Sequence, residues 1–251
     1  MSARFTRPKR IARILTSEWP VATKMALLRA ERLAGIDVVI PVSAYRAWIA
    51  AESDEIDYFT IYGALIDRHF PCDVAGAAVL DVGAHKGYFA LRSFADGAMR
   101  VDSYEPASQN LVSLRRSASG VAQWPVHPCA VGAEVGSVEL HLAPGSWGHS
   151  VHKPVGGESV GTETVDMVAL SDALASITSA GIPVVAKINV EGAAGSMILG
   201  TEPSDWSAVR LLWTDVEVND PVGLDEIIAH LTKCGMRHEQ SDGQRNLFVR
   251  G

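Results

Sequence analysis

A glycine turn between two apolar segments carries the clearest chemical signal in this sequence of 251 residues. The turn is DVGAHKGYF, residues 81–89, and it follows the apolar run Ala77 to Leu80. An amphipathic segment, Tyr88 to Phe94, comes next, so the pattern predicts a buried strand, a turn and the start of a helix. Glycines in such a turn let backbone N–H groups and a helix N-terminus approach a ligand closely. The turn therefore predicts a site for a nucleotide-like ligand.

The spacing of the glycines narrows the choice of ligand. A dinucleotide-binding turn has the pattern G-x-G-x-x-G, whereas this one has D-x-G-x-x-x-G. The departure argues against an NAD site, and the pattern resembles motif I of class I S-adenosylmethionine (SAM)-dependent methyltransferases. The resemblance implies that the turn forms the floor of a SAM site, made by Asp81, Gly83, Ala84, His85, Gly87 and Tyr88.

An acidic residue stands where a nucleotide ribose would need one. A second predicted strand, Met99 to Tyr104, ends in Glu105-Pro106, and Glu105 is 22 residues beyond Gly83. A carboxylate in this place accepts hydrogen bonds from ribose hydroxyls. We expect Glu105 and Pro106 to contact the ribose, and the alternative is a solvated glutamate before a proline turn. Cys129 and Ala130 are expected to line the adenine, with ordinary core packing as the alternative.

A second motif, KINVEG at residues 187–192, lies at the end of another apolar strand, where ligands of open α/β sheets bind. Together with DVGAHKGYF, YEP (104–106), AVG (130–132) and TVDM (164–167), it resembles the FkbM-type methyltransferases. The motifs occur in the family's order over about residues 77–220. The resemblance implies SAM as the cofactor and methyl transfer to a hydroxyl of a sugar, a glycan or a secondary metabolite.

Two positions depart from the family pattern. The family has an aspartate where this sequence has Asn189, and a second acid where it has Ala194 or Gly195. Asparagine is a poorer Mg²⁺ ligand than a carboxylate, so no metal site is expected, and the use of a divalent metal stays open. The lost acids motivate one alternative, a catalytically impaired SAM-binding scaffold or regulatory protein. An NAD-dependent oxidoreductase is the other.

Methyl transfer to an alcohol requires a nearby base or metal to remove the hydroxyl proton. The candidate catalytic residues at the strand ends and in the glycine-rich loop 143–161 are His149, Lys187, Asn189 and Glu191. His85, inside the glycine turn, is expected to contact SAM or the acceptor rather than to act as a base. His149 is expected to cover the site and take the proton, and the alternative is a solvent-facing loop histidine. Because a buried lysine needs a partner, Lys187 could instead form an internal ion pair with Glu191 or Asp81.

The pattern of strands and helices after residue 77 predicts the scaffold that positions these residues. Alternating strands and helices indicate an α/β fold with a mostly parallel sheet. A C-terminal hairpin around Asp242-Gly243 would add an antiparallel edge, as in the Rossmann-like, seven-stranded class I methyltransferase sheet. Residues 71–251 are expected to form the methyltransferase domain. Residues 1–70 are expected to form a helical extension or cap, with helices at about 20–33, 44–51 and 56–70.

Composition and charge limit the partners. The sequence is 47% hydrophobic and 20% charged, and no apolar run reaches the roughly 20 residues of a membrane span. The net charge of −7 argues against a nucleic-acid substrate, although residues 1–35 hold eight Lys and Arg against two Glu. The three separated cysteines form neither a zinc nor a disulfide pattern, which favours the cytoplasm. A small hydroxylated acceptor is the expected partner, and a homo-oligomer stays open.

Overall fold

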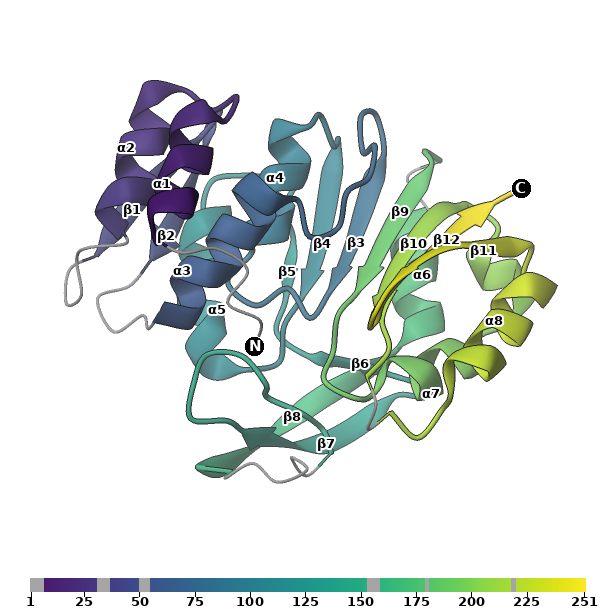
Figure 1. The fold of residues 1–251 in the computed structure, drawn as a ribbon. Coiled ribbons are helices and arrows are strands. Elements are labelled where there is room, and N and C mark those ends of the chain that lie inside the picture. Colours follow the sequence, from purple (N-terminus) through teal and green to yellow (C-terminus); the bar gives the residue numbers. More distant parts are fainter. Residues whose placement is uncertain (1–6, 31–36, 50–54, 153–158, 179–180, 218–219) are drawn as a thin grey trace.

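The structure is a computed structural model that describes residues 7–30, 37–49, 55–152, 159–178, 181–217 and 220–251. Within these residues, seven strands form the central sheet in the order β11-β12-β10-β9-β3-β4-β5 (Figure 1). Neighbours from β10 to β5 are parallel, and β12 is antiparallel to β10 and β11. The predicted fold class is confirmed. The strands are β3 (Ala78–Val82), β4 (Arg100–Tyr104), β5 (Val126–His127), β9 (Val184–Ile188), β10 (Val209–Asp215), β11 (Met236–Asp242) and β12 (Arg245–Arg250).

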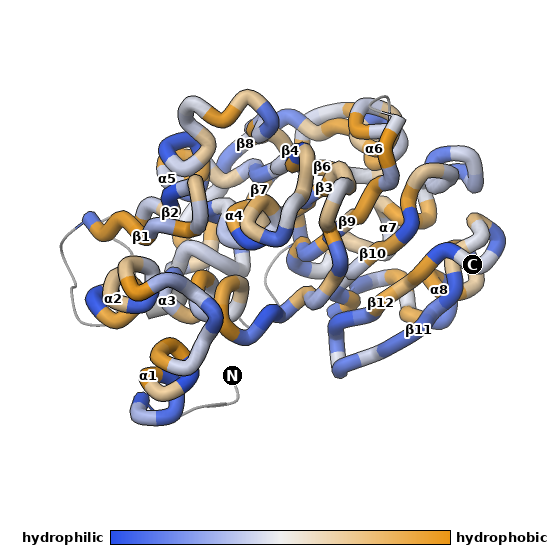
Figure 2. Tube along the Cα trace, turned by 90° about the horizontal axis from the view of Figure 1, so that it is seen from above, coloured by the Kyte–Doolittle hydropathy of each residue, from blue (hydrophilic) through white to orange (hydrophobic). Residues whose placement is uncertain are grey.

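Helices cover both faces of this sheet (Figure 1). Successive side chains of a strand point to opposite faces, so Val79 and Val185 enter one hydrophobic core while Leu80 and Ala186 enter the other. Figure 2 shows hydrophobic residues along β3 and β9 and hydrophilic residues along the edge strand β11. The first core is closed by α4 (Tyr88–Ala95) and α5 (Ser108–Ala118), the second by α6 (Leu170–Thr178), α7 (Ala194–Leu199) and α8 (Leu224–Lys233).

The described residues before β3 form three α-helices and a β-hairpin. The helices are α1 (Arg7–Thr16), α2 (Val21–Ala30) and α3 (Glu55–Tyr62), and α3 continues into the π-helix η1 (Gly63–Asp67). The predicted helix over 44–51 is wrong, because β1 (Val38–Val42) pairs antiparallel with β2 (Tyr45–Ile49). Short apolar segments do not distinguish a strand from a helix by periodicity. In β2 the buried positions Ala47 and Ile49 alternate as in a strand.

A second, three-stranded sheet lies beside the carboxyl ends of the central strands (Figure 1). It consists of β6 (Ala130–Gly132), β8 (Gly161–Ala169) and β7 (Gly136–Leu142), in that order. Residues 126–132 are divided between two sheets, because β5 pairs with β4 and β6 pairs with β8. The segment just after β7 reaches the turn that follows β3, where Ser146 Oγ lies 3.1 Å from His85 Nε2.

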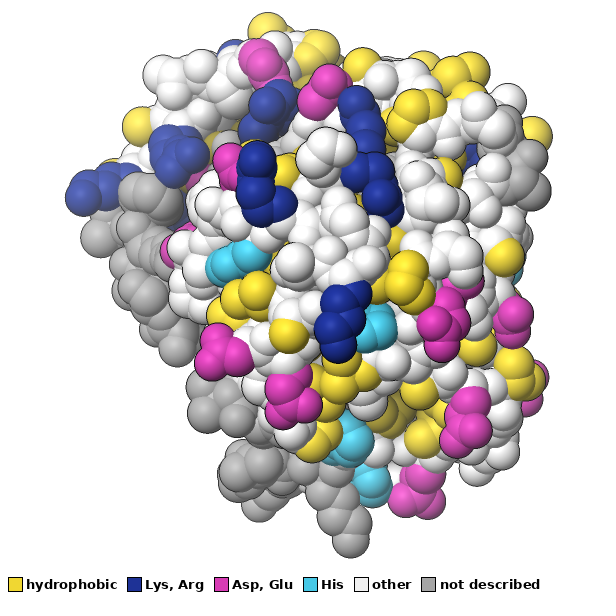
Figure 3. All heavy atoms as spheres, turned by 90° about the vertical axis from the view of Figure 1, so that its right-hand side faces the viewer, with side chains coloured by type: hydrophobic (Ala, Val, Ile, Leu, Met, Phe, Trp, Pro, Cys, Tyr) yellow, Lys and Arg dark blue, Asp and Glu magenta, His cyan; other side chains and the backbone are white. Residues whose placement is uncertain are grey.

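The edge strand β11 carries charged side chains of both signs. Arg237 forms an ion pair with Glu239 at 2.7 Å, and Arg245 of β12 pairs with Asp242. Figure 3 shows Lys, Arg, Asp and Glu side chains spread over this side of the molecule. Charges on an edge strand discourage pairing with another sheet. None of the described helices is long and apolar enough to cross a membrane.

Candidate functional site

The turn after β3 is shaped by two glycines with different tasks. Gly83 has a φ of 73°, and a Cβ on it would collide with the carbonyl oxygen of Asn189. Gly83 therefore lets the ends of β3 and β9 approach each other. A Cβ on Gly87 would lie 2.6 Å from the Leu114 side chain and 2.8 Å from that of Trp124. Gly87 thus allows α4 to pack on its neighbours, and it lines neither of the pockets described below.

Lys187 and Asp81 form a buried ion pair inside the sheet. They are register partners on β9 and β3, and Lys187 Nζ lies 2.9 Å from Asp81 Oδ1. The ammonium group also donates to the carbonyl oxygens of Val82 at 3.3 Å and Gly83 at 2.7 Å. A lysine ammonium has three hydrogens, and these three bonds use them. Lys187 thus makes the internal ion pair foreseen as an alternative, with Asp81 as its partner.

Glu105 lies at the end of β4 and is 5% exposed. Its Oε2 accepts the backbone N–H of His85 at 2.7 Å, and its Oε1 accepts the backbone N–H of Ala107 at 3.0 Å. Burial raises the pKa of Glu105 to about 7, although the hydrogen bonds from Ala107, His85 and Asn110 oppose the shift. Glu105 is not the solvated glutamate of the alternative interpretation, because it ties the glycine turn to the start of α5.

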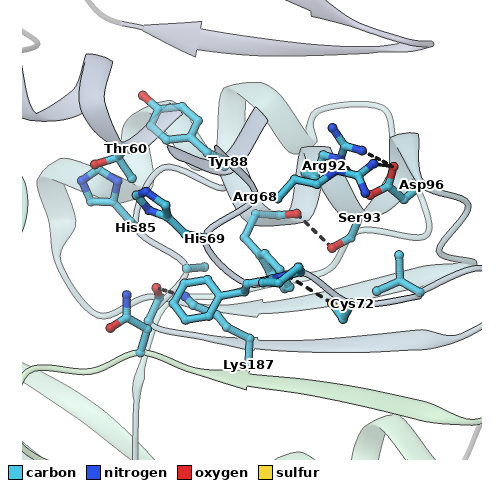
Figure 4. A pocket seen from close by; sticks show the side chains of 18 residues that line it. Thr60, Arg68, His69, Cys72, His85, Tyr88, Arg92, Ser93, Asp96 and Lys187 are labelled. Atoms are coloured by element: carbon cyan, nitrogen blue, oxygen red, sulfur yellow. Dashed lines mark hydrogen bonds and ion pairs between the residues drawn. The ribbon is translucent and has the colours of Figure 1, made fainter. Parts of the chain in front are cut away.

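Two pockets adjoin at the glycine turn. They share four lining residues, which are Thr60, Gly83, His85 and Asn189. The β4-side pocket is also lined by Glu105, Pro106, Asn110, Cys129, Ala130, Ser146, His149 and Glu191. The α4-side pocket is also lined by Ala84, Tyr88, Phe70, Cys72, Phe89 and Lys187. Figure 4 shows Thr60 and His85 at one end of the α4-side pocket and Arg92 and Asp96 at the other.

The predicted site residues therefore come together from distant parts of the chain. The residues predicted to bind the cofactor divide between the pockets: Gly83, His85, Glu105, Pro106, Cys129 and Ala130 line the β4-side pocket, Ala84 and Tyr88 line only the α4-side pocket, and Asp81 and Gly87 line neither. Asp81 lies within β3, before the turn. Its Oδ2 is buried without a hydrogen-bond partner among the described residues. The four predicted catalytic residues also line the pockets, with Asn189 at the junction.

His149 holds the loop after β7 in place. Its Nδ1 accepts the backbone N–H of Ala143 at 3.0 Å, and its Nε2 is hydrogen-bonded to the Gln109 side chain on α5. Burial lowers the pKa of His149. Both ring nitrogens thus have partners within the protein, and His149 is not the solvent-facing histidine of the alternative interpretation.

A network around His85 joins three segments that sequence reasoning did not connect. Asp57 of α3 is fully buried and forms an ion pair with Lys86. Ser146 Oγ lies 3.0 Å from Asp57 Oδ1 and 3.1 Å from His85 Nε2. Asp57 is the last of four acids between residues 52 and 57, a pattern typical of a solvated surface, and nothing in its loop distinguishes Ser146.

Carboxyl groups gather at the ends of β9 and β10. Burial, together with a hydrogen bond to Glu191, raises the pKa of Glu217 to about 8. Burial raises the pKa of Asp215 to about 6. Asp215 and Glu217 were not predicted from the sequence. They lie at the carboxyl end of β10, as Glu191 lies after β9, and ligands of open α/β sheets bind at such strand ends. No three His, Cys, Asp or Glu side chains are grouped as ligands of a metal ion among the residues that the structure describes.

The strand order, the glycine turn after β3 and the acid after β4 define a class I SAM-dependent methyltransferase. The sequence model of one family, described as the methyltransferase FkbM domain, matches residues 81–237. The chain therefore belongs to the FkbM methyltransferase family. No curated protein matches the sequence.

Solved structures with similar folds include methyltransferases of different kinds. A protein from Pyrococcus horikoshii, provisionally described as an RNA methyltransferase, is 11% identical over 92% of this chain and 99% of its own, with a TM-score of 0.43. A methyltransferase of calicheamicin biosynthesis is 12% identical over 78% of this chain and 55% of its own, with a TM-score of 0.41. Likeness this weak carries no argument about the acceptor.

Proposed function

We propose that this protein is an O-methyltransferase that transfers the methyl group of SAM to a hydroxyl of a small molecule, such as a sugar, a glycan or a secondary metabolite. The observation that carries the proposal is the meeting of the family motifs around two adjoining pockets, with Gly83, His85 and Asn189 at their junction. One pocket would hold the cofactor and the other the acceptor, so that the two reactants meet at the turn.

The β4-side pocket fits the nucleoside of SAM. Glu105 is a buried carboxyl with both oxygens fixed by backbone donors, and it would accept the ribose hydroxyls. Cys129 and Ala130 would line the adenine. The absence of a side chain at Gly83 leaves room for close approach of the backbone. When bound, SAM supplies an electrophilic methyl group on a sulfonium.

The α4-side pocket suits the acceptor. Its aromatic side chains, Phe70, Tyr88 and Phe89, would exclude water and hold the acceptor next to the junction, and such positioning is a large part of the catalytic effect. Asn189 would orient the acceptor hydroxyl through its amide. Lys187 would act through Asp81 by fixing the strand ends that carry the turn.

Glu191 is proposed to act from the cofactor side of the junction, where it would reach the acceptor hydroxyl at the meeting point of the two pockets. It lines the β4-side pocket, and its main-chain oxygen accepts the hydroxyl of Ser150 at 2.6 Å. Near neutral pH the raised pKa keeps Glu217 protonated, so Glu217 can donate to the Glu191 carboxyl. The Glu191 carboxyl would then be held in one orientation, in which it accepts a hydrogen bond from a hydroxyl of the substrate. The net charge of −7 supports a small molecule over a nucleic acid.

Calorimetry and a turnover assay test the proposal on the full chain. SAM and NAD⁺ are titrated side by side, and SAM is then incubated with methyl glucoside, benzyl alcohol, phenol and bulk transfer RNA while release of S-adenosylhomocysteine is measured. The proposal expects SAM binding and release with at least one hydroxylated small molecule. Binding of SAM without turnover would favour the scaffold alternative, preferential NAD⁺ binding would favour the oxidoreductase, and methylation of RNA alone would contradict a small acceptor.

A further inference from the structure

The hydrogen bonds around Ser146 fix the direction in which each proton is donated. Asp57 is fully buried, and its carboxylate, paired with Lys86, has only acceptor oxygens. Ser146 Oγ lies 3.0 Å from Asp57 Oδ1, so its single hydrogen is donated to that oxygen. The Ser146 oxygen is then left to accept a hydrogen from His85 Nε2, which lies 3.1 Å away.

This direction determines the tautomer of His85. A neutral imidazole carries one ring hydrogen on a nitrogen atom. The hydrogen bonds that run from Asp57 through Ser146 to His85 place this hydrogen on Nε2. His85 Nδ1 therefore bears a free lone pair, and it is buried with no hydrogen-bond partner among the described residues. A buried acceptor without a donor costs about 1–3 kcal/mol. A hydroxyl group brought by a ligand would remove that cost.

The position of His85 matches the place where such a hydroxyl would lie. His85 lines both pockets and stands between them with Gly83 and Asn189. Its φ of 54° is unusual for a residue other than glycine, and strained backbone of this kind concentrates at functional sites. His149, the other histidine of the β4-side pocket, has both ring nitrogens engaged by Ala143 and Gln109.

We infer that His85 is the catalytic base of the methyl transfer and that its Nδ1 takes the proton of the acceptor hydroxyl. The inference rests on the proposed function. The acceptor oxygen forms a bond to the methyl carbon as the bond from that carbon to sulfur breaks, and the electron pair of the broken bond stays on sulfur. The hydroxyl proton passes to Nδ1, which leaves a methyl ether and an imidazolium that returns its proton to water.

The charges around His85 suit a base that is neutral before each turnover. Burial lowers the pKa of His85 to about 4, Asp57 opposes the shift, and Lys86, Lys187 and His149 add to it. The imidazole is therefore unprotonated at neutral pH. Asp57 Oδ1 lies 3.7 Å from Nε2, where it stabilises the imidazolium once the proton arrives. Asp57 and Ser146 are accordingly positioning residues.

Nuclear magnetic resonance tests the tautomer without an acceptor. The full chain, with ¹⁵N-labelled histidine, is examined by long-range ¹H–¹⁵N spectra alone and with S-adenosylhomocysteine. The expected spectrum shows His85 protonated on Nε2 and bare on Nδ1. Ser146→Ala, which removes the acceptor of the Nε2 hydrogen, is expected to mix the two tautomers, whereas Ser159→Ala, an exposed serine before β8, is expected to leave them unchanged. A hydrogen on Nδ1 in the unsubstituted protein would overturn the inference.

Kinetics with the acceptor that gives turnover in the panel test the role of the base. His85→Asn suits the left-handed backbone and keeps the N–H donated to Glu105. It is expected to lower kcat by about 10²–10⁴-fold while the Kd for SAM changes by less than about threefold, and added imidazole should restore part of the rate. His152→Asn, at an exposed histidine, is the matched control with unchanged kcat.

The outcomes separate this inference from the proposed function. If the unsubstituted protein binds SAM and turns over but His85→Asn is equally fast, the base is elsewhere and the inference fails alone. If His85→Asn instead weakens SAM binding in proportion to its loss of rate, Nδ1 serves the cofactor, and the inference again fails. If the unsubstituted protein binds no SAM, the proposed function fails whatever the tautomer of His85.

Discussion

Glu105 combines burial with three hydrogen-bond donors, and this combination makes cofactor affinity depend on pH. Its pKa is raised to about 7 by burial, and the ionised carboxylate accepts hydroxyl hydrogens more strongly than the protonated acid. We expect the affinity for SAM to rise as the pH increases through about 7. In Glu105→Gln, the affinity should be weaker and should not change with pH in this range. Calorimetric titrations between pH 6 and pH 8 measure both. An equal pH dependence in the variant would remove Glu105 from the site.

The same shift predicts a slope in stability. The pKa of Glu105 rises from 4.5 to about 7 on folding, so between these values the folded chain binds more protons than the unfolded chain. The contribution of Glu105 to the free energy of unfolding is therefore largest below about pH 4.5 and decreases as the pH rises towards 7. Urea denaturation across this range should show a smaller fall in Glu105→Gln. A fall of the same size in both proteins would contradict the assignment.

Lys187 is expected to control stability because its partners are buried. Lys187→Met leaves Asp81 charged and unpaired and removes the donor to two carbonyl oxygens. Breaking a buried pair on one side costs about 3–5 kcal/mol, and denaturant titration should show a loss of this size. The double variant Asp81→Leu with Lys187→Met is expected to recover part of it. Lys233→Met, at an exposed lysine at the end of α8, is the matched control.

At the scale of elements, the loop after β7 depends on α5 for its position. His149 bonds to Ala143 within the loop and to Gln109 on α5, so His149→Ala should release the loop. Hydrogen exchange of residues 143–150 is expected to become faster, while that of β3 and β9 stays unchanged. His152→Ala, at an exposed histidine of the same loop, should leave the exchange rates as they are. Unaltered exchange in His149→Ala would show that other contacts hold the loop.

The elements differ in how well the sequence predicts them. Strands β3, β9 and β10 are predictable because each is largely apolar and is followed by a glycine or an acid, as β3 is by Gly83. The β11–β12 hairpin is predictable from its turn residues, Asp242-Gly243. The hairpin β1–β2 is not, because its short apolar segments fit either period. Glu105 and Asn189 were found because local motifs mark them. The contact of Asp57 with Ser146 joins residues 89 positions apart, and only the folded chain brings such residues together.

At the scale of the whole molecule, one hydrophobic core crosses the predicted boundary at residue 70. Ile14, Leu27 and Ile40 belong to the same core as Val79 and Leu91. We expect a chain that begins at residue 71 to lose cooperative folding or to aggregate, because the apolar surface under α4 would be exposed. Calorimetry of the full chain should show a single transition. A soluble 71–251 fragment with the same melting temperature would establish an independent domain.

The pairing of Asp81 with Lys187 also has a consequence for how the sheet assembles. Both strands are otherwise apolar at their buried positions, so hydrophobic burial alone discriminates weakly between alignments of β9 against β3. A slip of one residue would turn Lys187 to the opposite face and leave two charges buried without partners. We therefore expect the ion pair to favour this alignment of β9 against β3 over its alternatives, and it is this alignment that brings Asn189 beside Gly83.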